Sequence, residues 1–292
     1  MAKGGMSPEL SLWLSSGRYI DFKGRGIFVR ESKPSRKETI LLIHGFPTSS
    51  WDFLPIWQLL EKKYRLITFD MLGFGFSAKP QEHTYSIREQ ADIAELVLYA
   101  TNTRKYHLLG HDYGVSVAQE LLARQGALKK PALSVCFLNG GLYPEFHKPL
   151  LIQKLMLGPL GPLLARLSTK GKLRSSFAAI FGERKTSERE VDIFWELICY
   201  NKGRIVIPKL LRYMTERRLY RERWVTAMEQ TKIPVQMING PLDPISGRHL
   251  AEAFALRNPK ARVDSLEGVG HYPQVEAPER VAALYLDFLR QI

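Results

Sequence analysis

A five-residue segment, Gly110-His111-Asp112-Tyr113-Gly114, has the composition of a chemically active turn. An apolar run precedes it at residues 106–109, and apolar residues recur at helical spacing after it, from Val115 to Leu122. The pattern predicts a strand, a sharp turn between two glycines, and a helix. Such a turn holds its central residue, here Asp112, in a strained conformation that presents the side chain to a pocket.

The aspartate at this position changes the chemistry that the turn can support. Serine is the usual nucleophile there, and it needs a base before it attacks an acyl carbon. The Asp112 carboxylate is already ionised at neutral pH and can attack a strained or activated alkyl carbon, which forms an alkyl-enzyme ester. The alternative is structural, since an acid at a helix start also interacts favourably with the helix dipole.

Two further side chains follow later predicted strands. Asp243 comes after a strand at residues 234–238, and His271 comes after one at residues 262–266. Each could be an ordinary turn residue, but the carboxyl ends of parallel strands meet at one edge of a sheet. We therefore expect both to approach Asp112, in the nucleophile, acid, histidine order of hydrolases. His271 would activate the water that hydrolyses the ester, and Asp243 would orient the imidazole.

Ester hydrolysis also requires donors for an oxyanion. The backbone N–H groups of Tyr113 and Phe46 are the predicted pair, one after the nucleophile and one from the loop that follows an early strand. Because these roles use the backbone, the side chains stay free to shape the pocket. The predicted substrate-binding residues around it are His44, Pro47, His111 and His147.

The leaving group decides which further residues are needed. Opening an epoxide produces an alkoxide that must be protonated, and tyrosine hydroxyls can supply the proton. Tyr213 is the first candidate for this acid, Tyr143 is the second, and His147 is a further pocket residue that could serve. Packing is the alternative role for each tyrosine. A halide would instead require N–H donors near the nucleophile.

The order of the predicted elements indicates how these residues are positioned. A hairpin at residues 18–30 precedes alternating strands and helices, which is typical of a mostly parallel sheet wrapped by helices. The alternation stops over residues 143–228, where only helical periods are found. We therefore predict an α/β core at residues 1–142 and 229–292 with an inserted helical cap. Ser86 with Glu89, and Ser187 with Glu190, predict capping boxes at two helix starts.

The charge of the chain suggests two kinds of partner that its motifs do not support. Its 292 residues carry 42 Lys and Arg against 29 Asp and Glu, a net charge of +13, which could serve nucleic acid or an anionic membrane surface. The basic residues are spread along the chain, with concentrations at residues 166–174 and 212–223, and no nucleic-acid-binding motif accompanies them. We predict no nucleic-acid partner and, without a long apolar run, no integral membrane segment.

Other features predict the setting of the protein. The start of the chain lacks the apolar region of a secretory signal. Of the two cysteines, Cys136 lies in an apolar strand-like run, and no disulfide framework is indicated. We expect a cytoplasmic protein that needs no cofactor or metal. A homodimer is left open.

The chain resembles epoxide hydrolases of the α/β-hydrolase fold over nearly its whole length. The resemblance lies in residues 44–47 and 110–114, Asp243 and His271, and the segments 44–50, 111–114 and 240–244 are also similar to the mesoderm-specific transcript branch. It implies hydrolysis of a small hydrophobic epoxide by water to a vicinal diol. The sequence departs from the family in two ways. Tyr113 stands where tryptophan is frequent, and no tyrosine occurs between Lys148 and Cys199.

Two other functions are compatible with this fold. Haloalkane dehalogenases share the turn, but their halide-holding asparagine and tryptophan would fall at Phe46 and Tyr113, which have no side-chain N–H group. A non-catalytic binding protein is the other alternative. An intact set of Asp112, Asp243 and His271 argues against it, because a scaffold does not require such a set.

Overall fold

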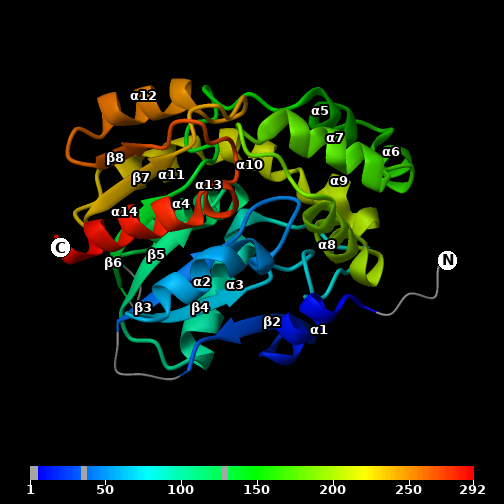
Figure 1. Ribbon diagram of the computed structural model, residues 1–292, viewed down its shortest axis with the longest axis horizontal. Helices are drawn as coiled ribbons and strands as arrows, with labels where there is room; N and C mark the ends of the chain where they lie inside the picture. Colours follow the sequence, from blue (N-terminus) through cyan, green and yellow to red (C-terminus); the bar gives the residue numbers. More distant parts are fainter. Residues whose placement is uncertain (1–5, 34–37, 127–130) are drawn as a thin grey trace.

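Within the residues that the computed structural model describes (6–33, 38–126 and 131–292), eight strands form one sheet in the order β1-β2-β4-β3-β5-β6-β7-β8 (Figure 1). The β1–β2 and β2–β4 pairs are antiparallel, and every other pair is parallel. The predicted α/β-hydrolase fold with a mostly parallel sheet is confirmed. Residues 1–5, on which the prediction about a secretory signal partly rests, lie outside the described residues.

The strands form where the sequence has short apolar runs. Their bounds are β1 (Gly17–Phe22), β2 (Arg25–Glu31), β3 (Thr39–Ile43), β4 (Arg65–Phe69), β5 (Tyr106–Gly110), β6 (Ala132–Phe137), β7 (Val235–Asn239) and β8 (Arg262–Ser265). Every residue of β3 and β5 is buried, because central parallel strands are covered by helices on both faces. β7 is displaced by one residue from the strand predicted at residues 234–238.

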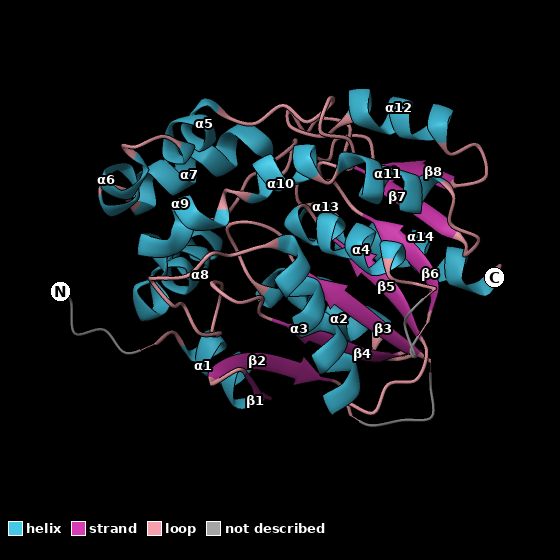
Figure 2. Cartoon of the chain, turned by 180° about the vertical axis from the view of Figure 1, so that it is seen from behind, coloured by secondary structure: helices cyan, strands magenta, loops and turns pink. Residues whose placement is uncertain are grey.

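Helices cover the two faces of the sheet (Figure 2). One face packs against α1 (Pro8–Ser15), α2 (Leu54–Leu60), which continues the short 3-10 helix η1 (Ser50–Phe53), and α14 (Pro278–Arg290), which follows α13 (Pro273–Glu276). The other face packs against α3 (Ile87–Ala100), α4 (Tyr113–Ala123), α11 (Arg221–Glu229) and α12 (Arg248–Arg257).

Between β6 and β7 the described chain is helical and contains no strand, as predicted. Its other helices are α5 (Leu151–Leu157), α6 (Gly161–Arg166), α7 (Lys170–Ile180), α8 (Glu188–Cys199), η2 (Tyr200–Val206), α9 (Ile207–Leu210) and α10 (Tyr213–Leu219). In both views α5 to α9 gather at one end of the molecule, whereas α11 packs on α4 of the core. The boundaries of a cap at residues 143 and 228 stay a prediction.

The two predicted capping boxes have different outcomes. At the start of α8, Ser187 and Glu190 make both hydrogen bonds of the motif. At the start of α3, the Ser86 hydroxyl accepts the Glu89 N–H, but the Glu89 carboxylate is 2.6 Å from the His83 ring instead of returning to Ser86. At this helix only the Ser86 half of the predicted capping box forms, because the His83 ring competes for the Glu89 carboxylate.

The turn between β5 and α4 brings a helix and a strand into close contact. Asp112 has φ 45° and ψ −102°, a conformation that non-glycine residues rarely adopt. Next to it, α4 approaches β3 so closely that a Cβ atom on Gly114 would lie 2.2 Å from the Ile43 carbonyl oxygen. The glycine is therefore required by the contact between helix and strand, and that contact fixes where Asp112 stands.

We expect Gly114→Ala to destabilise the fold by about 1–3 kcal/mol, because the added methyl group must displace the backbone of β3. Equilibrium urea unfolding measures this free energy. Gly126→Ala is the matched control, since nothing lies within 4 Å of a Cβ atom there. Equal stability of the two variants would contradict the proposed packing constraint.

Candidate active site

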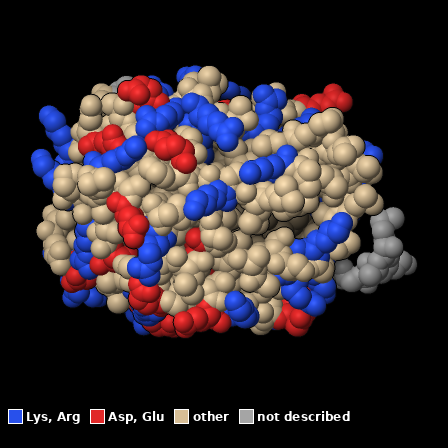
Figure 3. Space-filling view, turned by 90° about the horizontal axis from the view of Figure 1, so that it is seen from above, with Lys and Arg blue, Asp and Glu red and all other residues tan. Residues whose placement is uncertain are grey.

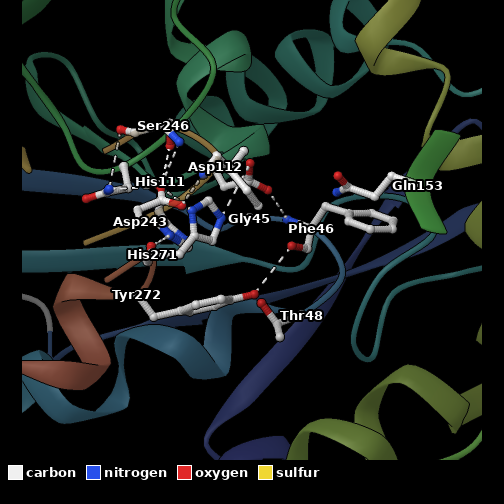
Figure 4. Close-up of polar contacts among 12 residues, drawn as sticks. Gly45, Phe46, Thr48, His111, Asp112, Gln153, Asp243, Ser246, His271 and Tyr272 are labelled. Atoms are coloured by element: carbon white, nitrogen blue, oxygen red, sulfur yellow. Dashed lines mark hydrogen bonds and ion pairs between the residues drawn. The ribbon is translucent and has the colours of Figure 1, made fainter. Parts of the chain in front are cut away.

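The Asp112 carboxylate is directed at the loop after β3. Its Oδ2 accepts the Phe46 N–H at 2.9 Å (Figure 4). Asp112 is 3% exposed and stands at the N-cap position of α4, yet its side chain accepts no hydrogen bond from the helix. Asp112 therefore makes no capping hydrogen bond to α4. A Cβ atom on Gly45 would lie 2.8 Å from the Asp112 Cβ, so only glycine allows this approach of the loop.

His271 lies between two carboxylates (Figure 4). Its Nδ1 is 2.7 Å from Asp243 Oδ2, and its Nε2 is 3.8 Å from Asp112 Oδ1. The side chains of all three residues are almost fully buried. The structure thus brings together the three residues that the strand ends were expected to bring together, with the imidazole in the middle.

Asn139, which the sequence analysis did not identify, links the two acids. Its amide Nδ2 donates to Asp243 Oδ2 at 3.0 Å, and its carbonyl oxygen accepts the Asp112 N–H at 2.7 Å. Asp243 also accepts the N–H groups of Ile245 and Ser246 and the Ser246 hydroxyl. A signal was present in the sequence, since Asn139 is the first polar residue after the apolar run of β6. The sequence did not indicate the hydrogen-bond partners of Asn139.

The charges of Asp112, Asp243 and His271 shift one another's pKa values, because the three groups lie close together in a buried site. Burial alone would lower the pKa of His271, but the carboxylates of Asp243 and Asp112 outweigh it and raise that pKa to about 9. Burial likewise opposes the charge on Asp243, and the His271 imidazolium overcomes it, bringing the pKa of Asp243 to about 2. The pKa of Asp112 also lies below its ordinary value, because His271 and Arg217 outweigh burial. At neutral pH the site holds an imidazolium between two carboxylates.

Arg217 of α10 is a second residue that the sequence analysis missed. It is 2% exposed, and its guanidinium donates to the Asp112 carbonyl oxygen at 2.9 Å and to the Ser116 hydroxyl at 2.7 Å. The side chain thus joins α10 to the nucleophile turn and places a cation beside Asp112. Because it lies in a strongly basic stretch of sequence, nothing distinguished it from its exposed neighbours.

Tyr213 lies beside the nucleophile turn, but it is not among the residues that line the cavity at Asp112. Its ring centre is 4.8 Å from that of Tyr113 and 6.1 Å from that of Phe46, and the Arg217 guanidinium lies 4.5 Å from the ring centre. The Tyr213 hydroxyl is buried and finds no hydrogen-bond acceptor among the described residues, while the neighbouring Arg217 guanidinium can only donate to it. Burial and the nearby Asp112 charge raise the pKa of Tyr213, so the hydroxyl keeps its proton.

Two other predicted acids are placed elsewhere. The Tyr143 hydroxyl donates to Glu229 at 3.1 Å and accepts from the Asn258 amide at 2.8 Å, so it is occupied by structural partners. Tyr143 does not line the cavity at Asp112, and its proposed role as the second acid is corrected to packing. His147 lines a different cavity, beside Arg217. Burial and the Arg217 charge lower the pKa of His147 to about 3.

Of the four predicted substrate-binding residues, one lines the cavity at Asp112. Pro47 lines it. His44 is fully buried and uses both ring nitrogens, toward the Gly45 carbonyl oxygen at 2.8 Å and the Met71 N–H at 3.0 Å. The His111 ring supports the histidine loop, with Nε2 2.8 Å from the His271 carbonyl oxygen. The predictions for His44 and His111 were wrong, because both rings order loop backbone behind the cavity.

The cavity at Asp112 has a volume of about 140 Å³. Asp112, His271 and Lys172 are the ionisable residues in its wall, and most of the remaining wall is apolar. Its outer part is formed by helices of the segment between β6 and β7, including Ile152 and Met156 of α5 and Leu164 of α6. The site therefore suits a small hydrophobic molecule with a polar reacting group.

The fold and this site agree with the comparison to known proteins. Residues 40–284 match the model of the alpha/beta hydrolase family, and the chain belongs to that family. It is accordingly a hydrolase of the alpha/beta hydrolase fold.

Particular relatives cover nearly the whole chain. The mesoderm-specific transcript protein of Mus musculus is 40% identical over 297 residues, which cover 97% of this chain and 89% of the relative. The putative hydrolase LipZ of Mycobacterium tuberculosis is 37% identical over 286 residues, covering 97% and 99%. Haloalkane dehalogenase DbeA from Bradyrhizobium elkani USDA94 has a similar structure, with a TM-score of 0.78, 22% identity and coverage of 95% and 99%. At this identity the likeness to DbeA shows the fold alone.

The raised pKa of His271 predicts a pH dependence of stability. The folded protein holds the His271 proton up to a pH of about 9, whereas unfolded histidine releases it near the ordinary pKa of 6.5. The stabilisation is complete below the lower value and is lost as the pH rises through the higher one. We expect the free energy of unfolding of His271→Gln, measured in urea between pH 6.5 and a pH of about 9, to lack this loss.

Comparison of each variant with the parent protein isolates this effect from other titrating groups. His249→Gln is the matched control, because His249 lies outside the site and contacts the Phe146 carbonyl oxygen. The control should keep the pH dependence of the parent. A parent and a His271→Gln protein that lose stability equally above pH 6.5 would contradict the charge arrangement.

Proposed function

We propose that this hydrolase converts epoxides to vicinal diols through an alkyl ester on Asp112. The observation that carries the proposal is the nature of the nucleophile: a buried, ionised aspartate stands where hydrolases of this fold usually have serine, with His271 and Asp243 beside it. A carboxylate attacks alkyl carbon, so a strained ring is a suitable substrate.

In the first step an Asp112 oxygen attacks an epoxide carbon, and the ring C–O bond breaks. Oδ2 is held by the Phe46 N–H, which leaves Oδ1 as the attacking atom. The alkoxide that forms takes the proton of Tyr213. The buried Tyr213 hydroxyl supports this role because it has no acceptor among the described residues and can donate to an oxygen that arrives with the substrate.

In the second step water attacks the ester carbon of Asp112, and His271 accepts the water proton. Ester formation neutralises Asp112 and removes one of the two anions that raise the pKa of His271. Loss of that charge favours the neutral imidazole that a base requires. The Phe46 and Tyr113 N–H groups stabilise the oxyanion. As the oxyanion collapses, the ester C–O bond breaks and the diol oxygen takes the proton held by His271. The carboxyl group of Asp112 then loses its proton, which restores the carboxylate, and Tyr213 is reprotonated.

Dehalogenation is the second candidate, and the residues at the nucleophile favour it less. A halide leaving group needs side-chain N–H donors beside the attacked carbon, and Phe46 and Tyr113 lack them. It needs no acid, so the Tyr213 hydroxyl would have no role. The two reactions are therefore distinguished by the product that the parent enzyme releases and by the residues that it requires.

We expect the parent enzyme to form diol from styrene oxide and no halide from a brominated alkane. His271→Gln should form the ester but hydrolyse it slowly, so intact-protein mass spectrometry should show the enzyme plus one substrate mass. Asp112→Ala is the control and should show no adduct. An adduct on the Asp112→Ala protein would place the nucleophile elsewhere, and halide release without diol would favour the dehalogenase alternative.

Tyr213→Phe should lower the rate of ester formation by roughly two orders of magnitude or more, because a positioned acid is lost. Hydrolysis of the ester should change little, since that step depends on His271. Single-turnover kinetics with styrene oxide separates the two steps. Tyr143→Phe is the matched control, because the Tyr143 hydroxyl is held by structural partners. Ester formation at the parental rate in Tyr213→Phe would show that the acid lies elsewhere.

A further inference from the structure

The helices α5 and α6 expose an unusual amount of apolar surface. None of the side chains of α5 is buried. Leu151 is 71% exposed, Leu160 is 62% exposed, and the other strongly exposed apolar residues of this segment are Ile152, Leu155, Leu157, Leu163 and Leu167. We call these seven residues the apolar patch. Contiguous exposed apolar surface of this kind marks an interaction site.

The same segment is strongly basic. Residues 148–176 contain no Asp or Glu and six cations, which are Lys148, Lys154, Arg166, Lys170, Lys172 and Arg174. Lys170 pairs with Asp192, and Arg174 pairs with Glu188. The remaining four, Lys148, Lys154, Arg166 and Lys172, form no salt bridge with a described residue. Leucines and uncompensated cations therefore occur together, and no acid within the segment offsets them.

The patch lies next to the cavity at Asp112. Ile152 belongs to both the patch and the cavity wall, and Lys172 lies in that wall as well. Both ribbon views place α5 and α6 at the outer edge of the molecule. Figure 3 shows a hollow beside largely uncharged surface that is interrupted by Lys and Arg side chains. A molecule that rests on this surface has a short path to the nucleophile.

We propose that α5 and α6 dock on the surface of an anionic phospholipid bilayer, so that apolar substrates pass from the lipid into the cavity at Asp112. The leucines insert among the acyl chains near the headgroups, and the four uncompensated cations bind lipid phosphates. No described helix is long and apolar enough to cross a bilayer. In the proposed contact, α5 and α6 lie on the bilayer surface. This docking does not depend on which bond the site hydrolyses.

Charge argues for lipid over a second copy of this chain on the same surface. A two-fold symmetric dimer presses a patch against its own copy. Here that would bring the uncompensated cations of both copies together, while an anionic bilayer neutralises them. Each basic residue close to such a surface raises partitioning roughly fivefold, so four of them give substantial affinity when the leucines insert as well.

Sedimentation with phosphatidylcholine vesicles, with and without phosphatidylglycerol, tests the docking. We expect the full chain to bind the vesicles that contain phosphatidylglycerol and to be released by salt, which screens charges over roughly 8 Å at physiological ionic strength. Lys154→Glu/Arg166→Glu should weaken this binding roughly 25-fold or more. Leu160→Ser/Leu163→Ser should weaken it on the same vesicles, and because both leucines are exposed, the fold should be retained.

A matched control lies on the other side of the molecule, on and after α12. Leu256 is 84% exposed, and Leu256→Ser/Lys260→Glu makes the same kinds of change there. The control should bind vesicles like the parent. All variants should keep parental turnover of a dissolved small substrate, so failure to dock is distinguishable from a wrong reaction. Absence of vesicle binding, equal binding by patch and control variants, or a dimer that the patch variants dissociate would overturn the proposal.

Discussion

The buried imidazolium of His271 between Asp112 and Asp243 is the interaction on which the rest of the structure depends. Two carboxylates inside an apolar wall are costly unless a cation and hydrogen-bond donors compensate them. His271 supplies the cation, at 2.7 Å from one acid and 3.8 Å from the other. The shifts in pKa of all three groups express this compensation. They also explain why neutralising Asp112 by ester formation is a suitable trigger for the second step.

Hydrogen bonds from polar side chains hold this charge arrangement in place from several directions. Asn139 joins the loops that carry the two acids, and Arg217 binds the turn of Asp112 from α10. The Glu276 carboxylate accepts the N–H groups of Gly182, Gly270 and Tyr272, so it ties the end of α7 to the loop of His271. Polar side chains thus connect the helical segment to the core at the site itself. A displacement of either part changes the geometry of the charges.

The functional proposals draw on different parts of the molecule. The reaction follows from the buried charges, whereas the docking surface follows from exposed apolar side chains and unpaired cations on and around α5 and α6. The sequence analysis noted the basic concentration at residues 166–174 but set a membrane partner aside, because charge along a chain does not reveal which cations are neutralised. In the folded protein two of the six cations of residues 148–176 have acidic partners, and the other four have none among the described residues. The fold also exposes the leucines beside them.

The sequence by itself determined the strands, the mostly parallel sheet, and the meeting of Asp112, Asp243 and His271, because apolar runs and glycine-bounded turns are local signals and parallel strands end at one edge. Only the tertiary structure decided how individual side chains are used. His44 and Tyr143 were expected at the substrate, yet their polar atoms are occupied by Met71 and Glu229. Asn139 and Arg217 carried no distinguishing pattern. Hydrogen-bond partners distant in the chain decide such roles, since a buried polar group takes whichever partner the packing brings within reach.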